Sequence, residues 1–428
     1  MSKAGGQVVQ NSRPYKVDGE VGRFTFLTHS ILNDTDIQYD TGRDIFLYLH
    51  GKEYYRTAGF KEIALIYGDT EKSYRKTAQL INRIRYQEKG GTPSRTLHEV
   101  TEREGTALLE HITGKTGQIL SDHGFEETGI YRGYNPKYTQ LFPVFLPQSE
   151  VDGALSACAE GCSFFDGHMG NPINYEDPCE TVNIAVDDVN VKRQEESRIP
   201  EKKRGEHKRK YAHNTIAHLS YSGTKYVLNS ASAISLIPVI MAFLLANGFS
   251  RKRFQFFTDG HTVLNKTIIK FFSWKRNIGI ILDWYHLGKK CGELLSQAMK
   301  GRNLRNEVLN KIKPLLWYGL ADKAIELLHE IPKKDIKSAQ SLEKLIAYLE
   351  RNRPYIPCYA ARKELGLCNS SAVGEKANDL IVSERQKHNG MSWTKKGTVA
   401  LAAITVLKQN NEHKKWFEDK DIDFKMAA

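Results

Sequence analysis

The sequence predicts an α/β protein with a mixed β-sheet core, an all-helical insertion into that core, and a helical region before it. Two short apolar runs, 254–257 and 278–282, have the aromatic and β-branched composition of buried strands. Each run is followed by an acid, Asp259 or Asp283. In an α/β sheet, ligands collect at the carboxyl ends of strands. A single acid there is more often a helix cap or a turn residue, so further acids are needed to indicate a site.

Length, charge and cysteine content narrow the class of protein. A chain of 428 residues is long enough for two or three domains. Its 62 Lys and Arg against 50 Asp and Glu give a net charge of +12, which favours a polyanionic partner, nucleic acid before an acidic membrane surface. Six cysteines are too few for a disulfide framework in so long a chain, and the first residues lack an apolar signal region. We therefore expect a protein of the cytoplasm.

The most apolar stretch of the chain is 231–249. Its uninterrupted apolar part, 239–246, is too short to span a bilayer. We expect a buried helix that leads into the strand at 254–257, and no association with a membrane.

The N-terminal part divides into two expected regions. Residues 1–60 form a partly disordered region, because 1–20 are polar and 22–49 have no clear period. Residues 61–125 form a helix-turn-helix-like DNA-binding domain, which opens with a strand at 63–67.

The helical pair of this domain surrounds a glycine turn at 90–91. Apolar residues at helical spacing begin at Tyr74, and a second helix begins at 92–94 and ends near Gly105. Two helices with a turn are what a reader of the DNA major groove needs, although any small helical hairpin has the same outline. The cations expected to contact DNA here are Arg75, Lys76 and Arg95.

Residues 126–180 are expected to connect this domain to the core. The segment begins aromatic and rich in turns, and then contains residues that could bind zinc. Their spacing is not one of the common zinc patterns, and buried free thiols are the alternative. The candidate zinc ligands are Cys158, Cys162, His168 and Cys179.

A strand at 182–191 carries two adjacent acids, Asp187 and Asp188, in its middle. Acids inside an apolar strand are costly unless a positive group meets at least one of them, which favours a metal ion. The loop that follows, 192–211, is strongly basic, and it either is a solvated loop or steers a phosphate toward the metal. Its cations expected to contact DNA are Lys202, Lys203, Arg204, Lys208, Arg209 and Lys210.

The remaining chain continues and closes the core. After a first part at 181–285, apolar residues recur at helical spacing through 286–360, which predicts the inserted helical subdomain. Residues 361–410 supply the last helices of the core, one of which carries Glu375, and 411–428 form a charged tail.

The order of these elements is that of an RNase H-like catalytic core. Three segments resemble bacterial insertion-sequence DDE transposases, in particular those related to the Mutator type with an all-helical insertion. They are TDGH at Asp259, the D-x-x-H of DWYH at Asp283 to His286, and SSAVGEKANDLIVSERQKHNGMSW, which contains Glu375. The resemblance covers about residues 60–410.

The resemblance implies a two-metal active site for DNA strand cleavage and transfer. Asp187, Asp259 and Glu375 would be the catalytic acids and would bind two Mg²⁺ (or Mn²⁺) ions, for which carboxylate oxygens are suitable ligands. Asp188 is the alternative to the first acid, and Glu384 to the last, because Gly374 is unfavourable within a helix. We expect Asp283 to cap the first inserted helix, and His286 to support the site without binding metal.

The implied partners are double-stranded DNA, as transposon ends and as target, and further copies of the chain in a homodimer or higher oligomer on DNA. The implied location is the bacterial cytoplasm, with the nucleoid. One alternative is a domesticated or non-catalytic DNA-binding protein that retains the fold. A stand-alone RNase H-like nuclease is a third, which the helix-turn-helix and the long insertion disfavour.

Overall fold

The computed structural model divides into two compact units, which are described separately. The first unit comprises 1–111, 191–212 and 381–423, and the second comprises 112–190, 213–380 and 424–428. None of the helices in the described part of the chain is both long and apolar enough to cross a membrane. The residues that the structure describes are 7–32, 38–40, 54–71, 73–87, 91–125, 145–169, 175–194, 211–275, 278–370, 379–387 and 391–426.

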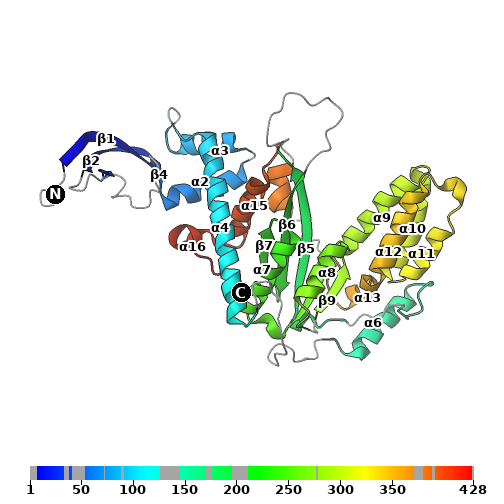
Figure 1. Ribbon diagram of the computed structural model, residues 1–428. Coiled ribbons are helices and arrows are strands. Elements are labelled where there is room, and N and C mark those ends of the chain that lie inside the picture. The colour runs from blue at the N-terminus through cyan, green and yellow to red at the C-terminus, as the bar shows by residue number, and fades with distance from the viewer. Residues whose placement is uncertain are drawn as a thin grey trace. The chain divides into compact units, whose positions relative to one another are not determined.

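The second unit is built on a five-stranded mixed sheet of order β7-β6-β5-β8-β9 (Figure 1). β5, β8 and β9 are parallel to one another, and β6 and β7 form an antiparallel pair. Counted along the chain, the strands lie in the order third, second, first, fourth, fifth, which is compatible with an RNase H-like core. The strands are β5 (Thr181–Lys192), β6 (Tyr211–Tyr221), β7 (Thr224–Ser230), β8 (Arg253–Thr258) and β9 (Ile278–Leu282).

Helix α7 (Ala233–Ala246) packs on β7 and on α8 (Thr262–Phe271), and α8 is tied to the end of β8 by the Thr258 hydroxyl, which donates to Asn265 Oδ1 at 2.9 Å. α7 begins at Ser232, whose side chain accepts a hydrogen bond from the Ser235 N–H, and most of its apolar residues are buried. Phe243 stacks on Tyr226 of β7 with ring centroids 4.3 Å apart. The prediction of a buried helix within 231–249 is therefore confirmed.

The helices predicted for the insertion at 286–360 are present. Each of its four helices packs against two others of the set, which encloses one apolar core (Figure 1). The apolar residues that recur at helical spacing, such as Leu295, Ile312, Leu328 and Leu349, are fully buried in that core. The helices are α9 (Trp284–Ala298), α10 (Arg302–Trp317), α11 (Ala321–His329) and α12 (Ala339–Asn352), joined by short 3₁₀ turns η3 (Lys333–Asp335) and, after α12, η4 (Arg353–Tyr355).

Around the insertion, α6 (Gln148–Glu160) of the expected connector packs against α13 (Tyr359–Glu364). An apolar cluster that includes Cys158, Cys162 and Cys358 lies between the two helices. These cysteines are free thiols.

The first unit begins with a four-stranded sheet of order β3-β2-β1-β4. We expected disorder over 1–20, but residues 7–19 form β1, which pairs with β2. Local polarity misled the prediction because the buried Tyr15 and Val17 alternate with polar residues, as in a half-buried strand. The strands are β1 (Gln7–Gly19), β2 (Gly22–Leu32), β3 (Gln38–Asp40) and β4 (Tyr54–Arg56).

The predicted strand at 63–67 is wrong, because α2 (Ala58–Thr70) occupies this segment. The side chain of Thr57 accepts a hydrogen bond from the Phe60 N–H at 3.1 Å, as a helix cap does. Phe60 and Ala64 are buried four residues apart, which is the spacing of one helix face.

The predicted helical pair corresponds to α3 (Tyr74–Ile84) and α4 (Ser94–Asp122), but α4 does not end near Gly105. It continues for 29 residues in all. A Cβ atom at Gly105 would lie 2.3 Å from the Ala400 carbonyl oxygen of α15 (Lys395–Gln409), so this glycine permits a close approach of two helices rather than a helix end. The structure does not show a helix-turn-helix in this region.

The C-terminal part contributes η5 (Asp379–Lys387), a π-helix, and then α15 and α16 (His413–Asp419). We expected an uninformative charged tail after 410, but Trp416 and Phe417 of α16 are buried. The charged composition of the segment concealed this packing. Two aromatic residues among charged ones are enough to anchor a short helix.

Candidate active site

The parallel register of β5, β8 and β9 places three acids at one level. Ala185 lies opposite Phe257, and Phe257 lies opposite Ile281. Two residues further along each of these chains stands an aspartate, and the carboxyl ends of β8 and β9 are reached there. The sheet therefore brings Asp259 and Asp283 to one edge, as the acids that follow the two apolar runs predicted, and it places Asp187 of β5 level with them.

Asp283 is the N-cap residue of α9. Its Oδ1 accepts hydrogen bonds from the Tyr285 N–H at 2.8 Å and the His286 N–H at 3.1 Å, and the Ser370 hydroxyl donates to the same oxygen at 3.3 Å. The residue is 1% exposed. The structure shows the helix cap that we expected at this position.

His286 lies between two of the acids. Its Nε2 is 3.8 Å from Asp187 Oδ1, and its Nδ1 is 3.5 Å from Asp283 Oδ1, at the limit of a hydrogen bond. Burial lowers the pKa of His286, but the Asp283 carboxylate and the negative charges of Asp187 and Asp259 outweigh burial and hold the pKa above its ordinary value. The two neighbouring carboxylates thus favour the protonated form of the imidazole.

The surroundings of Asp187 disfavour its ionised form. Burial raises its pKa, and the negative charges of Asp259 and Asp188 add to the effect, so that His286 does not fully offset them. About a quarter of the side chain is exposed, 26%, which leaves it accessible to a ligand. An acid of this kind is typical of a functional site.

Asp188 has different surroundings from its neighbour. Successive residues of a strand point to opposite faces, and the Asp188 carboxylate accepts a hydrogen bond from the Thr215 hydroxyl of β6. Its backbone N–H donates to Asp187 Oδ1 at 2.8 Å. Of the two, Asp187 is the acid whose pKa responds to Asp259 and His286.

Asp259 lies in a tight turn that α12 supports. Its Oδ1 accepts a hydrogen bond from the His261 N–H at 2.8 Å, and its carbonyl oxygen accepts one from the Tyr348 hydroxyl at 3.0 Å. Gly260 has a φ of +80°, and a Cβ there would lie 2.7 Å from the Asn352 Oδ1, so only glycine fits. Sequence reasoning missed Tyr348 and Asn352, which are far from the turn in the chain.

Glu375 lies outside the described residues, but the segment that leads to it is firmly held. The fully buried Arg362 donates to both carboxylate oxygens of Glu176, at 2.6 and 2.5 Å, and to the Cys368 carbonyl at 2.6 Å. The next carbonyl, that of Asn369, accepts from the Trp284 N–H at 3.2 Å. Residues 368–370 are thereby fixed beside the start of α9, five positions before Glu375. The alternative acid, Glu384, is an exposed residue of η5 in the first unit.

The four candidate zinc ligands do not form a metal site, and this prediction is corrected. Cys158 and Cys162 are buried among apolar residues, whereas Cys179 is exposed and His168 is 90% exposed beside Asp166. The alternative of buried thiols describes Cys158 and Cys162. Cys158 on α6 and Cys162 just after its end lie in one apolar cluster, but the chain beyond them leads the other two ligands away.

For a divalent ion, the donor chemistry at the sheet edge fits: Asp187 and Asp259 offer the hard carboxylate oxygens that Mg²⁺ prefers. Within the described ranges, no three His, Cys, Asp or Glu side chains already stand close enough to hold a metal ion. A third ligand would have to come from outside those ranges, where Glu375 lies.

The expected DNA-contacting cations have differing surroundings. Arg75 and Lys76 are exposed on α3. Arg95 is also exposed, but its Nε is 3.0 Å from Glu99 Oε1 on the same helix, which reduces its availability for a phosphate. The six cations of the basic loop, from Lys202 to Lys210, lie outside the described residues.

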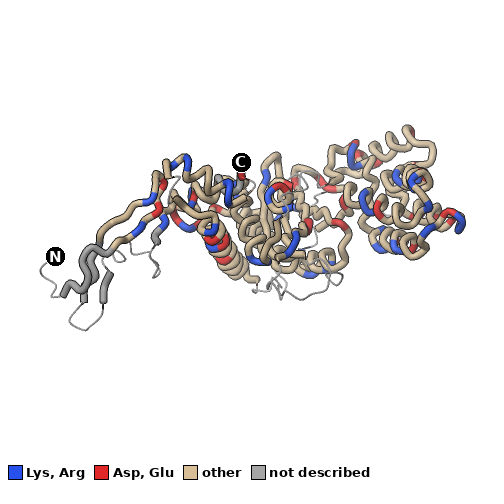
Figure 2. Tube along the Cα trace, turned by 90° about the horizontal axis from the view of Figure 1, so that it is seen from above, with Lys and Arg blue, Asp and Glu red and all other residues tan. Residues whose placement is uncertain are grey.

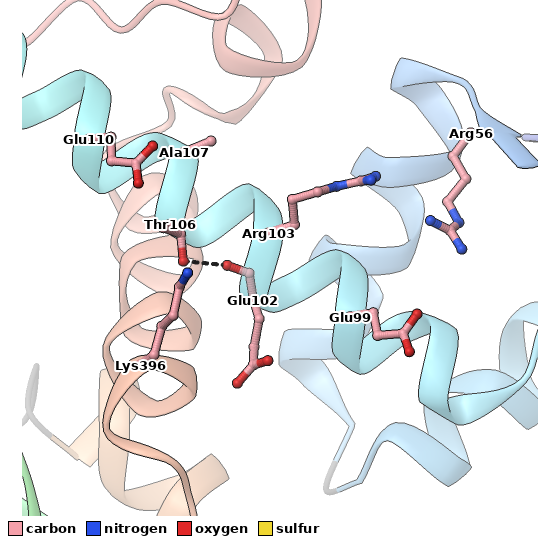
Figure 3. Close-up of a pocket in the computed structure, with 8 residues that line it drawn as sticks. All are labelled: Arg56, Glu99, Glu102, Arg103, Thr106, Ala107, Glu110 and Lys396. Atoms are coloured by element: carbon pink, nitrogen blue, oxygen red, sulfur yellow. Dashed lines mark hydrogen bonds between the residues drawn. The ribbon is translucent and has the colours of Figure 1, made fainter. Parts of the chain in front are cut away.

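A hollow of about 470 Å³ lies in the first unit along α4 (Figure 3). Three acids and three cations line it, so it has no clear preference for a charged ligand. The Thr106 hydroxyl donates to the Glu102 carbonyl at 2.6 Å within it. None of the predicted catalytic acids contributes. The lining residues are Arg56, Glu99, Glu102, Arg103, Thr106, Ala107, Glu110 and Lys396.

Comparison with known proteins gives little further information. No protein-family model and no curated protein matches the chain. Among solved structures, the Drosophila P element transposase strand transfer complex is similar over 80% of this chain and 84% of that chain, with 12% sequence identity and a TM-score of 0.20. A likeness at this TM-score carries no inference about fold or function.

Proposed function

We propose that the chain is a DDE-type transposase, which binds double-stranded DNA and catalyses metal-dependent strand cleavage and strand transfer. The observation that carries the proposal is the register of β5 and β8, which brings Asp187 level with Asp259 at the edge of the sheet. The negative charge of Asp259 adds to the burial that disfavours the ionised form of Asp187, and a divalent ion between the two carboxylates would remove that penalty. The net charge of +12 suits a nucleic-acid substrate.

In this proposal Asp187, Asp259 and Glu375 hold two Mg²⁺ or Mn²⁺ ions. When bound, such ions activate the attacking hydroxyl or water and stabilise the leaving oxygen of the phosphodiester. Asp283 fixes the start of α9, and through it the position of His286. The imidazole of His286 orients Asp187 and partly neutralises it, in the manner of an outer-shell residue.

The proposed DNA partners are transposon ends and target DNA, bound by a homodimer or a higher oligomer. Arg75 and Lys76 are exposed, and within the described part of the chain no acid forms an ion pair with them, which makes them better candidates for phosphate contacts than Arg95. The basic loop 192–211 remains a proposed contact that brings the phosphate backbone toward the acids.

The test is strand cleavage and strand transfer on end-bearing duplex DNA with Mg²⁺, Mn²⁺ or EDTA. Asp187→Asn and Asp259→Asn should abolish cleavage and leave DNA binding intact. Asp188→Asn is the matched control, since it removes the adjacent charge of the same strand, and it should retain cleavage. Cleavage by Asp187→Asn but not by Asp188→Asn would refute the assignment of the first acid.

A second comparison concerns the last acid. Glu375→Gln should abolish cleavage, whereas Glu384→Gln should not; the opposite outcome transfers the role to Glu384. If the wild-type chain binds end-bearing DNA but never cleaves it with either metal, the protein is the non-catalytic DNA-binding alternative. Cleavage without strand transfer would instead support a stand-alone nuclease.

A further inference from the structure

One end of the helical insertion gathers six cationic side chains. It consists of 299–306, which spans the connection from α9 and the first residues of α10, and of 331–338 between α11 and α12. We call it the insertion tip. Figure 2 marks cations along the insertion in blue. The tip contains one acid, Asp335, so its formal charge is six minus one, or +5. Its cations are Lys300, Arg302, Arg305, Lys333, Lys334 and Lys337.

Backbone contacts bring the two segments of the tip together. Met299 and Ile336 form an isolated antiparallel bridge. The Lys300 N–H donates to the Asp335 carbonyl at 2.9 Å, and the Lys337 N–H donates to the Ala298 carbonyl at 2.7 Å. The tip is therefore one surface formed by segments about thirty residues apart.

The tip cations are not neutralised by the described residues around them. Lys300 Nζ donates to the Lys334 carbonyl at 2.7 Å, and Arg305 donates to Asn306 and Ser296, which are all neutral acceptors. Lys333, Lys334 and Lys337 are exposed, and within the described residues no ion pair joins them to an acid. Elsewhere in the insertion cations do have acidic partners, such as Lys311 with Glu307 at 2.8 Å.

We propose that the insertion tip binds the phosphate backbone of nucleic acid. Like charges held on one surface repel one another, and a polyanion that displaces its counterions gains affinity from each neutralised phosphate. An anionic membrane surface would share this electrostatic attraction, but surface-binding elements also insert apolar side chains. Among the described residues, the exposed large apolar side chains lie outside the tip. The choice of DNA as the nucleic acid rests on the function proposed above.

The test uses the full chain and a duplex oligonucleotide in EDTA, with binding followed by fluorescence anisotropy from low to high salt. The tip variant combines Lys333→Gln, Lys334→Gln and Lys337→Gln. The matched control combines Lys290→Gln, Lys323→Gln and Lys344→Gln, three exposed lysines on α9, α11 and α12. Both remove three positive charges, so a general effect of net charge is the same in each.

Each phosphate contact contributes about 0.9 to the slope of log K against log salt, so the tip variant should lower that slope by about 2 to 3. Near 0.1 M salt its affinity should fall at least about tenfold below that of the control. Equal slopes for the two variants, at equal thermal stability, would overturn the proposal. So would loss of binding to phosphatidylserine vesicles with unchanged DNA binding, which assigns the tip to a membrane surface.

The outcome is separable from that of the proposed activity. Binding is measured without a divalent ion, so the catalytic acids do not enter it. A chain that needs the tip to bind DNA but cleaves nothing upholds the tip and refutes the activity. If the wild-type chain cleaves DNA but the tip variant has an unchanged salt slope, the proposed activity is supported and the proposal for the tip is refuted.

Discussion

Substitution of Glu176 by Gln tests whether the buried pair with Arg362 holds the segment before Glu375. Both residues are almost inaccessible, at 2% and 0% exposure of the side chains. Burial by itself raises the pKa of Glu176, but the Arg362 charge and its hydrogen bonds outweigh burial and hold the pKa below its ordinary value. The pair is thus ionised at neutral pH. Removal of one charge leaves the other buried without compensation.

Breaking a buried pair in this way costs about 3 to 5 kcal/mol. We expect the lower end, about 3 kcal/mol, because the amide oxygen of Gln still accepts one bond and Arg362 keeps the Cys368 carbonyl at 2.6 Å. For a unit of roughly 250 residues, that loss lowers the melting temperature by about 6 to 12 °C. Hydrogen–deuterium exchange should also become faster at 368–370, because Arg362 fixes these backbone groups.

The assay is thermal unfolding of the full chain with exchange followed by mass spectrometry. The control is the double variant Glu176→Leu with Arg362→Met, which removes both charges and should be more stable than Glu176→Gln. An unchanged melting temperature and unchanged exchange for Glu176→Gln would show that the pair does not secure this segment.

Three further predictions concern stability. Gly105→Ala should destabilise the first unit by about 1 to 2 kcal/mol in urea unfolding. The new methyl group would overpack against the Ala400 backbone, and this cost exceeds the gain in helix propensity of about 1 kcal/mol. A variant more stable than the wild type would contradict the close approach of the two helices. Burial and then the Lys225 charge lower the pKa of His218 to about 4. As pH falls from about 6.5 to 4, the free energy of unfolding of the wild type should therefore decrease by about 3 kcal/mol more than that of His218→Gln. Parallel pH profiles of the two proteins would contradict this. Asp187→Asn should raise the melting temperature in EDTA at pH 7, because the raised pKa of Asp187 means that its ionised form destabilises the fold. The gain should vanish below about pH 4, where Asp187 is protonated in the folded and the unfolded chain. A lower melting temperature of the variant at pH 7 would contradict this.

Elements with strong periodicity could be predicted from the sequence. β9 was predicted with its bounds, Ile278–Leu282, because a buried parallel strand needs a continuous apolar run. The helices α9 to α12 followed from the spacing of their leucines. The segment 63–67 failed because five apolar residues have no distinguishable period, and the buried face of α2 is set by what packs on it.

Contacts between distant segments could not be predicted in this way. Glu176 and Arg362 are 186 positions apart, and no local pattern marks either as buried. Gly105 resembled a helix end, because the sequence does not distinguish a glycine that ends a helix from one that lets a neighbouring helix approach closely. Tyr348 and Asn352, which support the turn at Asp259, likewise belong to a helix whose own spacing explains only its apolar face.

The same dependence on neighbours separates the roles of the three aspartates at the sheet edge. Asp259 and Asp283 each follow an apolar strand, whereas Asp187 lies within one, and the register places all three at one level. Asp283 already accepts two helix N–H groups and a hydroxyl, so a metal ion would have to compete with the cap that starts α9. Asp187 instead faces the negative charge of Asp259, which a cation relieves. A divalent ion would therefore stabilise the Asp187 and Asp259 side of the edge and weaken the cap at Asp283, which is why we propose metal binding for the first two acids and a supporting role for the third.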